Sequence, residues 1–227
     1  DFLLSNYIFS AAFTIACILF IVNGVNFLDG FNGLVSIHAI IIMIILLMIN
    51  NTSPLNLSDT EISKLIFVSI ICFFIFLIYN FPYGKIFLGD NGSYFTGIIL
   101  SILVIGVYEI NLNFVSPVFY AILLHLIFFE VFFSYFRKLL LGKSPFYPDK
   151  DHLHMIIYYI LREKNLNFIK SNYVTSLIFN TYYLIILFPA FYYKGNTLFC
   201  LWYFFFLLIM YVSIYLFLLN YKNKKPF

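Results

Sequence analysis

The sequence predicts an all-α membrane protein: a single domain over residues 1–227 that forms a polytopic bundle of about seven transmembrane helices. Of its 227 residues, 63% are apolar and 10% carry charge, and the mean hydropathy is +0.97. Soluble domains carry about 25% charged residues, so the composition excludes that class. Apolar runs recur along the chain, each near the ~20 residues that a helix needs to cross the hydrocarbon core. They cover residues 7–28, 34–49, 65–81, 94–108, 114–136, 173–193 and 198–219.

The segments between these runs are polar and differ in length. Runs 34–49 and 94–108 are short for a full span, so we expect their polar flanks to form the first turns of the helices. The longest polar stretch, 138–171, follows the fifth run. Its turn-forming residues 142–148 predict a turn-rich lead into a short helix that carries His152 and His154.

Basic residues predict the orientation, because lysine and arginine favour cytoplasmic loops. If the segment after Leu28 is cytoplasmic, 11 of the 13 basic residues lie on that side, and only Lys64 and Lys194 lie outside. No basic run indicates nucleic-acid binding. The cytoplasmic set is Lys85, Arg137, Lys138, Lys143, Lys150, Arg162, Lys164, Lys170, Lys222, Lys224 and Lys225.

Three polar motifs interrupt the apolar chain, each at an expected membrane boundary. They are residues 23–34 (Asn-Gly-Val-Asn-Phe-Leu-Asp-Gly-Phe-Asn-Gly-Leu), 87–93 (Phe-Leu-Gly-Asp-Asn-Gly-Ser) and 148–154 (Pro-Asp-Lys-Asp-His-Leu-His). Two crossings separate each motif from the next, so all three are expected on the cytoplasmic face. A polar site at a membrane surface is typical of an enzyme that joins a lipid to a water-soluble co-substrate.

In the first motif, Asn23, Asn26 and Asp29 recur every three residues and so trace one stripe at the end of a helix. The glycines that follow let a backbone bend or approach a ligand closely. Asparagines alone are often hydrogen-bonding links between membrane helices. An acid at membrane depth is costly and usually functional, so the addition of Asp29 favours a binding or catalytic face.

The second motif places Asp90 at the start of a helix whose N-terminal amides could face an anion. A carboxylate there would repel that anion unless a divalent cation joined the two, as Mg²⁺ does with one or two carboxylates and phosphate oxygens. The alternative is that Asp90 is a helix N-cap.

In the third motif, His152 and His154 are two residues apart, which puts both rings on one side of an extended segment. Zinc wants three or four nitrogen or sulfur ligands, and His38 and His125 are expected inside the membrane, so zinc ranks low. The imidazoles suit a diphosphate as donors to its oxygens. The alternative is two solvated loop histidines. Glu130, inside the fifth run, is a membrane acid and so functional by default. The alternative is a bundle-facing residue that pairs locally, and Glu130 is left out of the expected site.

These motifs, in this order, resemble the bacterial polyprenyl-phosphate N-acetylhexosamine-1-phosphate transferases, including the undecaprenyl-phosphate N-acetylglucosaminyl-1-phosphate transferases. The likeness runs from about residue 8 to residue 157. It implies a bacterial inner-membrane, Mg²⁺-dependent (or Mn²⁺-dependent) enzyme that moves a sugar-1-phosphate from a UDP-N-acetylhexosamine to undecaprenyl phosphate and releases UMP. This reaction would be the first membrane step in the synthesis of a cell-surface polysaccharide such as the O-antigen.

The resemblance also assigns roles to residues. It implies catalytic roles for Asp29 and Asp90, with Asp90 as the metal ligand. The apolar bundle would guide the prenyl chain among membrane lipids, and a homodimer is left open. The residues implied in substrate binding are Asn23, Asn26, Asn32, Phe87 (stacked on uracil), His152 and His154.

The chain departs from the family pattern in several places. The family's adjacent Asp-Asp motif and about four early helices have no counterpart in these residues, so we expect this chain alone to be inactive. Met155 stands where many relatives carry histidine, and Asn32 where many carry aspartate. Two other classes compete: a secondary transporter, whose site would lie near the bilayer midplane, and a non-catalytic bundle, which would not need three glycine-flanked motifs on one face.

Overall fold

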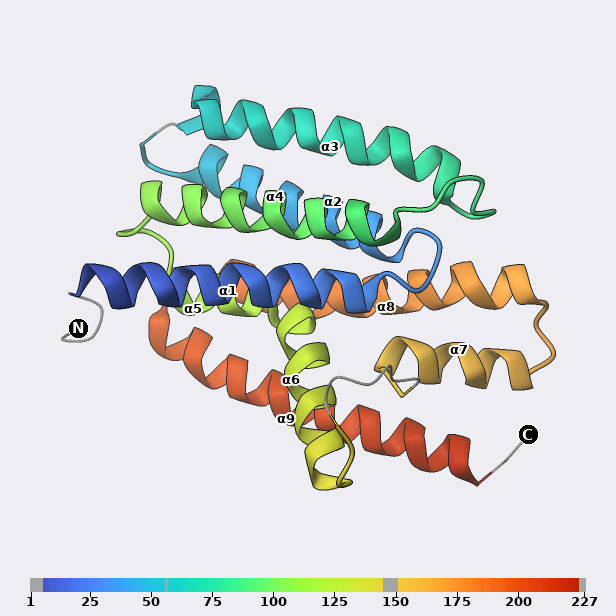
Figure 1. Ribbon diagram of the computed structural model, residues 1–227. Helices are drawn as coiled ribbons and strands as arrows, with labels where there is room; N and C mark the ends of the chain where they lie inside the picture. The colour runs from blue at the N-terminus through green and yellow to red at the C-terminus, as the bar shows by residue number, and fades with distance from the viewer. Residues whose placement is uncertain (1–5, 56, 145–150, 225–227) are drawn as a thin grey trace.

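The computed structural model describes residues 6–55, 57–144 and 151–224 of the chain, and all its regular elements are helices (Figure 1). Six of them are long and apolar enough to cross a membrane, and a bent pair makes a seventh span, which confirms the expected polytopic all-α bundle. The six are α1 (Tyr7–Leu28), α2 (Leu34–Thr52), α3 (Glu61–Asn80), α4 (Gly89–Ile110), α8 (Phe168–Tyr192) and α9 (Thr197–Asn223).

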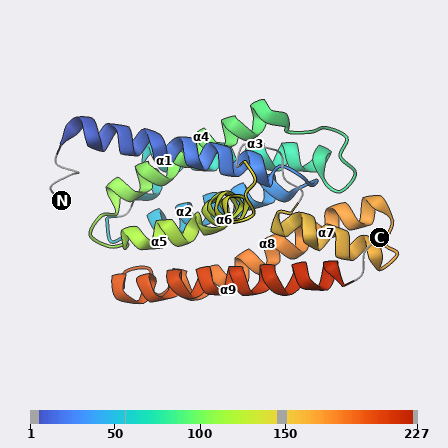
Figure 2. The same ribbon diagram turned by 60° about the horizontal axis from the view of Figure 1, so that its bottom comes forward.

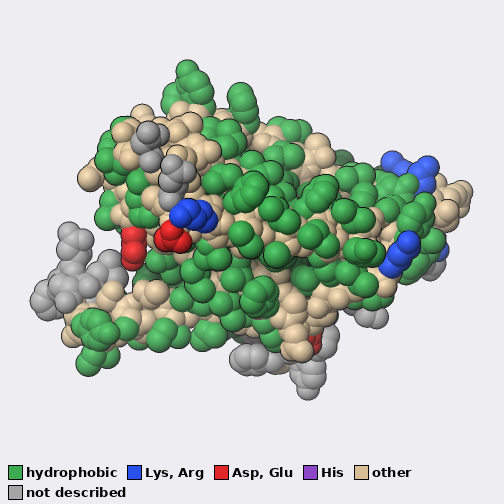
Figure 3. All heavy atoms as spheres, turned by 90° about the horizontal axis from the view of Figure 1, so that it is seen from above, with side chains coloured by type: hydrophobic (Ala, Val, Ile, Leu, Met, Phe, Trp, Pro, Cys, Tyr) green, Lys and Arg blue, Asp and Glu red, His purple; other side chains and the backbone are tan. Residues whose placement is uncertain are grey.

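The central helix of the bundle is α2, which packs against α3, α4 and α8 and buries most of its surface. The first helix, α1, packs against α4 and α6. In Figure 1 α6 runs across α1, and Figure 2 shows α6 nearly end-on. Other faces are open and apolar: α3 exposes Phe67, Phe74 and Ile78. Seen from above, apolar side chains cover the surface between charged groups at the two ends (Figure 3). This is the surface that a lipid bilayer requires.

Close approach of α1 to its neighbours depends on small residues. A Cβ atom at Gly97 of α4 would lie 2.6 Å from the Cα of Val22, and one at Gly24 of α1 would lie 2.4 Å from Cγ2 of Ile127. Small residues allow the backbones of membrane helices to approach in this way. The interface between α1 and α4 therefore tolerates no side chain at Gly97.

The fifth expected span, residues 114–136, is not one straight helix. It is divided into α5 (Pro117–Leu123) and α6 (His125–Leu140), which meet at 70°. The break frees backbone carbonyls that lipid could not hydrogen-bond. Within the bundle, Nδ1 of His125 donates to the carbonyl of Ile122 at 2.6 Å, and the Tyr183 hydroxyl donates to that of Leu123. Side chains thus restore the hydrogen bonds that the bend removes.

The other helix boundaries match the sequence closely. The polar flank of the run 94–108 does form the first turn of α4, which begins at Gly89 and includes Asp90. The flank of the run 34–49 instead extends the far end of α2, to Thr52. The expected short helix is α7 (Leu153–Glu163), with His152 as its N-cap residue and His154 in its first turn. Residues 145–150, including the start of the third motif, lie outside the described residues.

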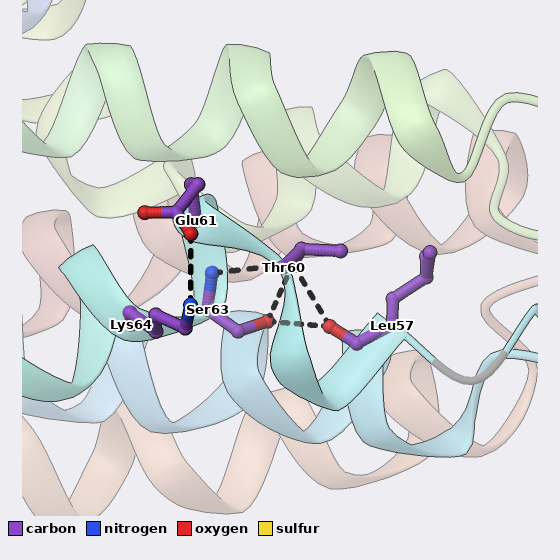
Figure 4. Close-up of polar contacts among 5 residues, drawn as sticks. All are labelled: Leu57, Thr60, Glu61, Ser63 and Lys64. Atoms are coloured by element: carbon purple, nitrogen blue, oxygen red, sulfur yellow. Dashed lines mark hydrogen bonds and ion pairs between the residues drawn. The ribbon is translucent and has the colours of Figure 1, made fainter.

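The end of the bundle opposite the motifs is tied by a polar network. At the start of α3, Thr60 Oγ1 and Ser63 Oγ both donate to the carbonyl of Leu57, at 2.8 Å each, and Lys64 pairs with Glu61 at 2.8 Å (Figure 4). Ser63 also accepts from the Asn50 amide of α2, which in turn accepts from Asn111 at 2.9 Å. These bonds join α2, α3 and the end of α4.

Candidate functional site

The three motifs meet at one end of the bundle, which we call the motif end. The last turn of α1 with residues 29–33, the loop 81–88 with the start of α4, and the start of α7 all lie there (Figure 1). Antiparallel order explains this: α1 runs toward the motif end, and the pair α2 and α3 returns the chain to it before α4 begins.

Asn26 connects the first motif to the second. Its side-chain amide donates to Oδ1 of Asp90 at 3.2 Å and to Oγ of Ser93 at 2.9 Å. Ser93 in turn donates to the backbone carbonyl of Asp90 at 3.0 Å. The exposed Asp90 carboxylate is therefore held from α1 by Asn26, while Ser93 binds the backbone of Asp90 within α4.

Asp29 follows the last residue of α1 and lies close to Asp90. Burial, and to a smaller extent the negative charge of Asp90, raises the pKa of Asp29 from 3.8 to about 6. Among the described residues, neither carboxylate forms an ion pair. Two neighbouring acids without a cationic partner are the arrangement that a divalent cation would stabilise.

The donor set fits magnesium better than zinc. No group of three or more His, Cys, Asp or Glu side chains gathers for a metal in the described part of the chain. Mg²⁺ is commonly held by one or two carboxylates, with water and substrate phosphate oxygens completing its shell. Asp29 and Asp90 supply such a pair.

Asn32 joins three segments of the motif end. Its backbone N–H donates to Oδ1 of Asn172 on α8 at 2.8 Å, and its side-chain amide donates to the carbonyl of Pro82 at 3.0 Å. Next to it, the N–H of Gly33 donates to Oδ1 of Asn80 at 2.6 Å. An aspartate at position 32 could not donate to Pro82, so the asparagine suits this loop. Its expected contact with substrate stays a prediction.

Asn23 and Phe87 are exposed at the motif end. The exposed Asn23 amide donates to the carbonyl of Leu19 on its own helix, at 2.7 Å. Phe87 is 76% exposed, three residues before Asp90. Its ring face is accessible, and its stacking on a base stays a prediction.

His152 and His154 are buried, so the alternative of two solvated loop histidines is wrong. Their rings stack, with centroids 5.5 Å apart and an 11° angle between the planes. Phe27 of α1 lies against His152 and Phe31 against His154, with centroids 5.5 and 5.8 Å apart. Nε2 of His154 would lie 3.6 Å from a Cβ at Gly30. The third motif thus packs directly on the first.

Glu130 of α6, set aside in the sequence, is the residue that joins the two histidines. Its carboxylate is 1% exposed, with Oε2 at 2.9 Å from Nδ1 of His152 and Oε1 at 3.7 Å from Nδ1 of His154. The first distance is a hydrogen bond; the second is an ion-pair distance only. An acid inside an apolar run signalled a functional residue, but its partners 22 and 24 positions later could not be identified from the sequence.

The residue before the histidines is clamped by two helices. The backbone carbonyl of Asp151 accepts from Nη1 of Arg137 on α6 at 2.6 Å and from the Tyr215 hydroxyl on α9 at 3.0 Å. Its carboxylate pairs with Lys222 of α9 at 2.9 Å. In the sequence, Arg137 and Lys222 indicated only topology.

An apolar cleft of about 690 Å³ opens beside this site, between α1, α6 and α9. Most of its lining residues are aromatic, and one of them, Tyr211, also interacts with Glu130. The lining residues are Phe13, Ala16, Cys17, Phe20, Ala121, Phe128, Phe129, Phe132, Phe133, Phe136, Phe204, Leu208, Tyr211 and Val212.

Comparison with known proteins shows what the chain is similar to. Residues 2–108 match glycosyl transferase family 4. The resemblance drawn from the motifs is confirmed, and the matched segment contains the first two of them. No solved structure matches the chain.

Three curated relatives of this transferase family are similar to the chain. An undecaprenyl-phosphate alpha-N-acetylglucosaminyl 1-phosphate transferase of Thermotoga maritima is 32% identical over 60% of this chain and 38% of its own length. A probable undecaprenyl-phosphate N-acetylglucosaminyl 1-phosphate transferase of Bacillus subtilis is 33% identical over 62% and 38%. A decaprenyl-phosphate N-acetylglucosaminephosphotransferase of Mycobacterium leprae is 32% identical over 64% and 40%. The matches thus span about two fifths of each relative's length.

Proposed function

We propose that this chain is part of a membrane enzyme that transfers an N-acetylhexosamine-1-phosphate from a UDP-sugar to undecaprenyl phosphate. The single observation that carries the proposal is the meeting of Asp29, Asp90 and the buried histidine pair at the motif end, beside an apolar cleft. The names of the three relatives support a polyprenyl-phosphate acceptor, undecaprenyl in two and decaprenyl in the third, and an N-acetylglucosamine sugar. The resemblance implies that the donor is a UDP-sugar and that the reaction belongs to cell-surface polysaccharide synthesis.

The proposed reaction forms one phosphoanhydride bond and breaks another. An oxygen of the lipid phosphate attacks the phosphorus that bears the sugar, the bond between the two phosphates of the donor breaks, and UMP leaves with that bond's electron pair. No net proton is gained or lost. Both reactants are anions, so the site must bring negative charges together and stabilise them.

The residues of the motif end divide these tasks. Asp29 and Asp90 would hold Mg²⁺ or Mn²⁺, which supplies charge neutralisation to the phosphate oxygens. Asn26 keeps Asp90 in place, and the histidines offer ring nitrogens to the diphosphate. Phe87 offers an aromatic face to uracil. The cleft walls would hold the prenyl chain, since burial of apolar carbon favours such a site.

The same proposal places the protein in a bacterial inner membrane with the motif end in the cytoplasm. The uneven distribution of basic residues supports this orientation. UDP-sugars are water-soluble, so a donor site at the cytoplasmic surface needs no transport step.

The decisive experiment measures UMP release from membranes that carry the protein in its full natural length. The donors are UDP-N-acetylglucosamine and UDP-N-acetylgalactosamine, with undecaprenyl phosphate and Mg²⁺. Release should need both lipid and metal, and Asp90→Asn should lower it at least roughly 100-fold, because charge stabilisation dominates such reactions. The matched control is Glu109→Gln, an exposed acid at the opposite end of α4. If folded and inserted protein released no UMP with any donor, the proposal would be overturned.

A further inference from the structure

Glu130, His152 and His154 form a buried triad that no other part of the site explains. All three side chains are at most 9% exposed, and the carboxylate lies between the Nδ1 atoms of the two stacked rings. Three separate segments supply the triad's surroundings: α6 carries Glu130, α7 begins at the histidines, and α1 covers them with Phe27 and Phe31. A carboxylate so deeply buried is retained only where it is paired.

The hydrogen bond to Glu130 decides which form of the ring is present. A carboxylate only accepts, so Nδ1 of His152 must carry a proton. With Nδ1 protonated, Nε2 can donate to a substrate oxygen only if the ring is the imidazolium cation. A buried imidazolium is unfavourable without a nearby anion, and Glu130 is that anion.

Nε2 lies on the edge of each ring opposite to Nδ1. No described residue hydrogen-bonds to Nε2 of either histidine, and Nε2 of His154 would lie 3.6 Å from a Cβ at Gly30, the residue after Asp29. The triad therefore places its buried carboxylate on one side of the rings and Nε2 of His154 on the side of Gly30.

We propose that Glu130 is a positioning residue that fixes the orientation of His152 and His154, so that their Nε2 atoms face the diphosphate of the donor. This inference rests on the proposed transferase function. It assigns a task to a carboxylate that touches neither substrate nor metal.

Other titratable groups lie next to the triad. On α9, Tyr211 interacts with Glu130, and Tyr215 interacts with both Glu130 and Arg137. Next to the histidines, Asp151 is paired with Lys222. Of these groups, the charged ones are one further acid and two bases, which leaves Glu130 as the anion in direct contact with the rings.

The test compares Glu130→Gln with Glu130→Asp in membranes carrying the full-length protein. Glutamine still accepts a hydrogen bond but carries no charge, so it holds the two rings less firmly. Because the rings would then face the diphosphate less often, kcat should fall roughly 10- to 100-fold with KM nearly unchanged, as when an orienting carboxylate is lost behind a metal-bound histidine. Glu130→Asp should recover much of the lost kcat, and Glu109→Gln should match the wild type throughout.

A purely structural role for Glu130 gives a different pattern. It would lower the amount of folded protein and leave kcat per folded molecule unchanged. A wild-type kcat per folded molecule in Glu130→Gln overturns the inference while leaving the transferase function intact.

A second measurement does not depend on activity. Nitrogen-15 NMR of histidine-labelled protein in liposomes reports the protonation of each ring, with His152→Asn to assign the signal. We expect the Nδ1 signal of His152, which reports its hydrogen bond to Glu130, to shift in Glu130→Gln and to stay in place in Glu109→Gln. An unchanged Nδ1 signal in Glu130→Gln overturns the inference, and an inactive transferase with the expected NMR change would overturn only the proposed reaction.

Discussion

Asp29 bears an electrostatic cost in the folded protein. It follows the last residue of α1, half-buried and near Asp90, and its pKa is raised to about 6. A carboxyl group whose folded pKa lies above its unfolded value of about 4 favours folding while it is protonated. That contribution is lost as the pH rises through the folded pKa. At neutral pH without metal, the charge on Asp29 therefore destabilises the protein.

Asp29→Asn should remove this cost. With a metal chelator present, the melting temperature of the variant minus that of the wild type should increase from pH 5 to pH 7.5. The reason is that the folded wild type ionises at position 29 over that interval, whereas the asparagine of the variant does not. Added Mg²⁺ should narrow the gap by stabilising the carboxylate. Thermal unfolding followed by intrinsic fluorescence measures both effects, with Glu109→Gln as the control for loss of an exposed acid. A difference in melting temperature that is constant across this pH range would contradict an electrostatic cost at Asp29.

The residues of the site were predictable to the extent that their chemistry is local. Asn26 and Asp29 stood out because their helical spacing and an acid at a membrane boundary are visible in the sequence. Glu130 and Tyr215 were not, because their roles depend on which helix passes beside the histidines. The loop contacts of Asn32 likewise depend on α8, 140 residues away.

At the scale of elements, contact between α1 and α4 determines the distance between Asn26 and Asp90. Gly97 lies on that interface, where a Cβ would meet the backbone of Val22. A side chain can change its rotamer to relieve such a contact, but a backbone atom cannot, so one helix would have to move.

Gly97→Ala should therefore destabilise the protein by about 1–3 kcal/mol, the usual cost of overpacking, and should lower transferase activity by separating Asn26 from Asp90. The matched control is Gly106→Ala on the same helix, where a Cβ would meet only the flexible end of Ile62. Thermal unfolding and UMP release should both distinguish the two variants. Equal stability and activity would mean that the interface adapts without cost.

The helices themselves were largely predictable, because a run of apolar residues of span length has few alternatives in a membrane. The division between α5 and α6 was not. The run 114–136 contains no proline or glycine near Leu124, and the groups that satisfy the broken turn include Tyr183, on a different helix. A bend that is stabilised by tertiary partners leaves no signal in its own segment.

At the scale of the whole molecule, orientation in the membrane is the property on which the proposed reaction depends. Loop 81–88 and the turn 111–116 lie at opposite ends of α4. Tyr83 and Leu112, exposed by 70% and 54%, mark the two ends.

Single cysteines at these positions should react from opposite sides. In a background without Cys17, Cys72 and Cys200, a membrane-impermeant maleimide should label Tyr83→Cys only in inverted vesicles and Leu112→Cys only in intact cells. Labelling of both from the same side would contradict the crossing of α4, and the reverse pattern would contradict a cytoplasmic site.

The clamp on Asp151 has a genetic consequence. Two of the partners described above, Tyr215 and Lys222, belong to α9, which carries none of the three motifs. A nonsense codon just after that of Ile214 would leave every motif intact in the translated product, yet it would release the segment that presents the histidines. Such late-stop alleles should behave as loss-of-function alleles, although a reading of the motifs alone would score them as harmless.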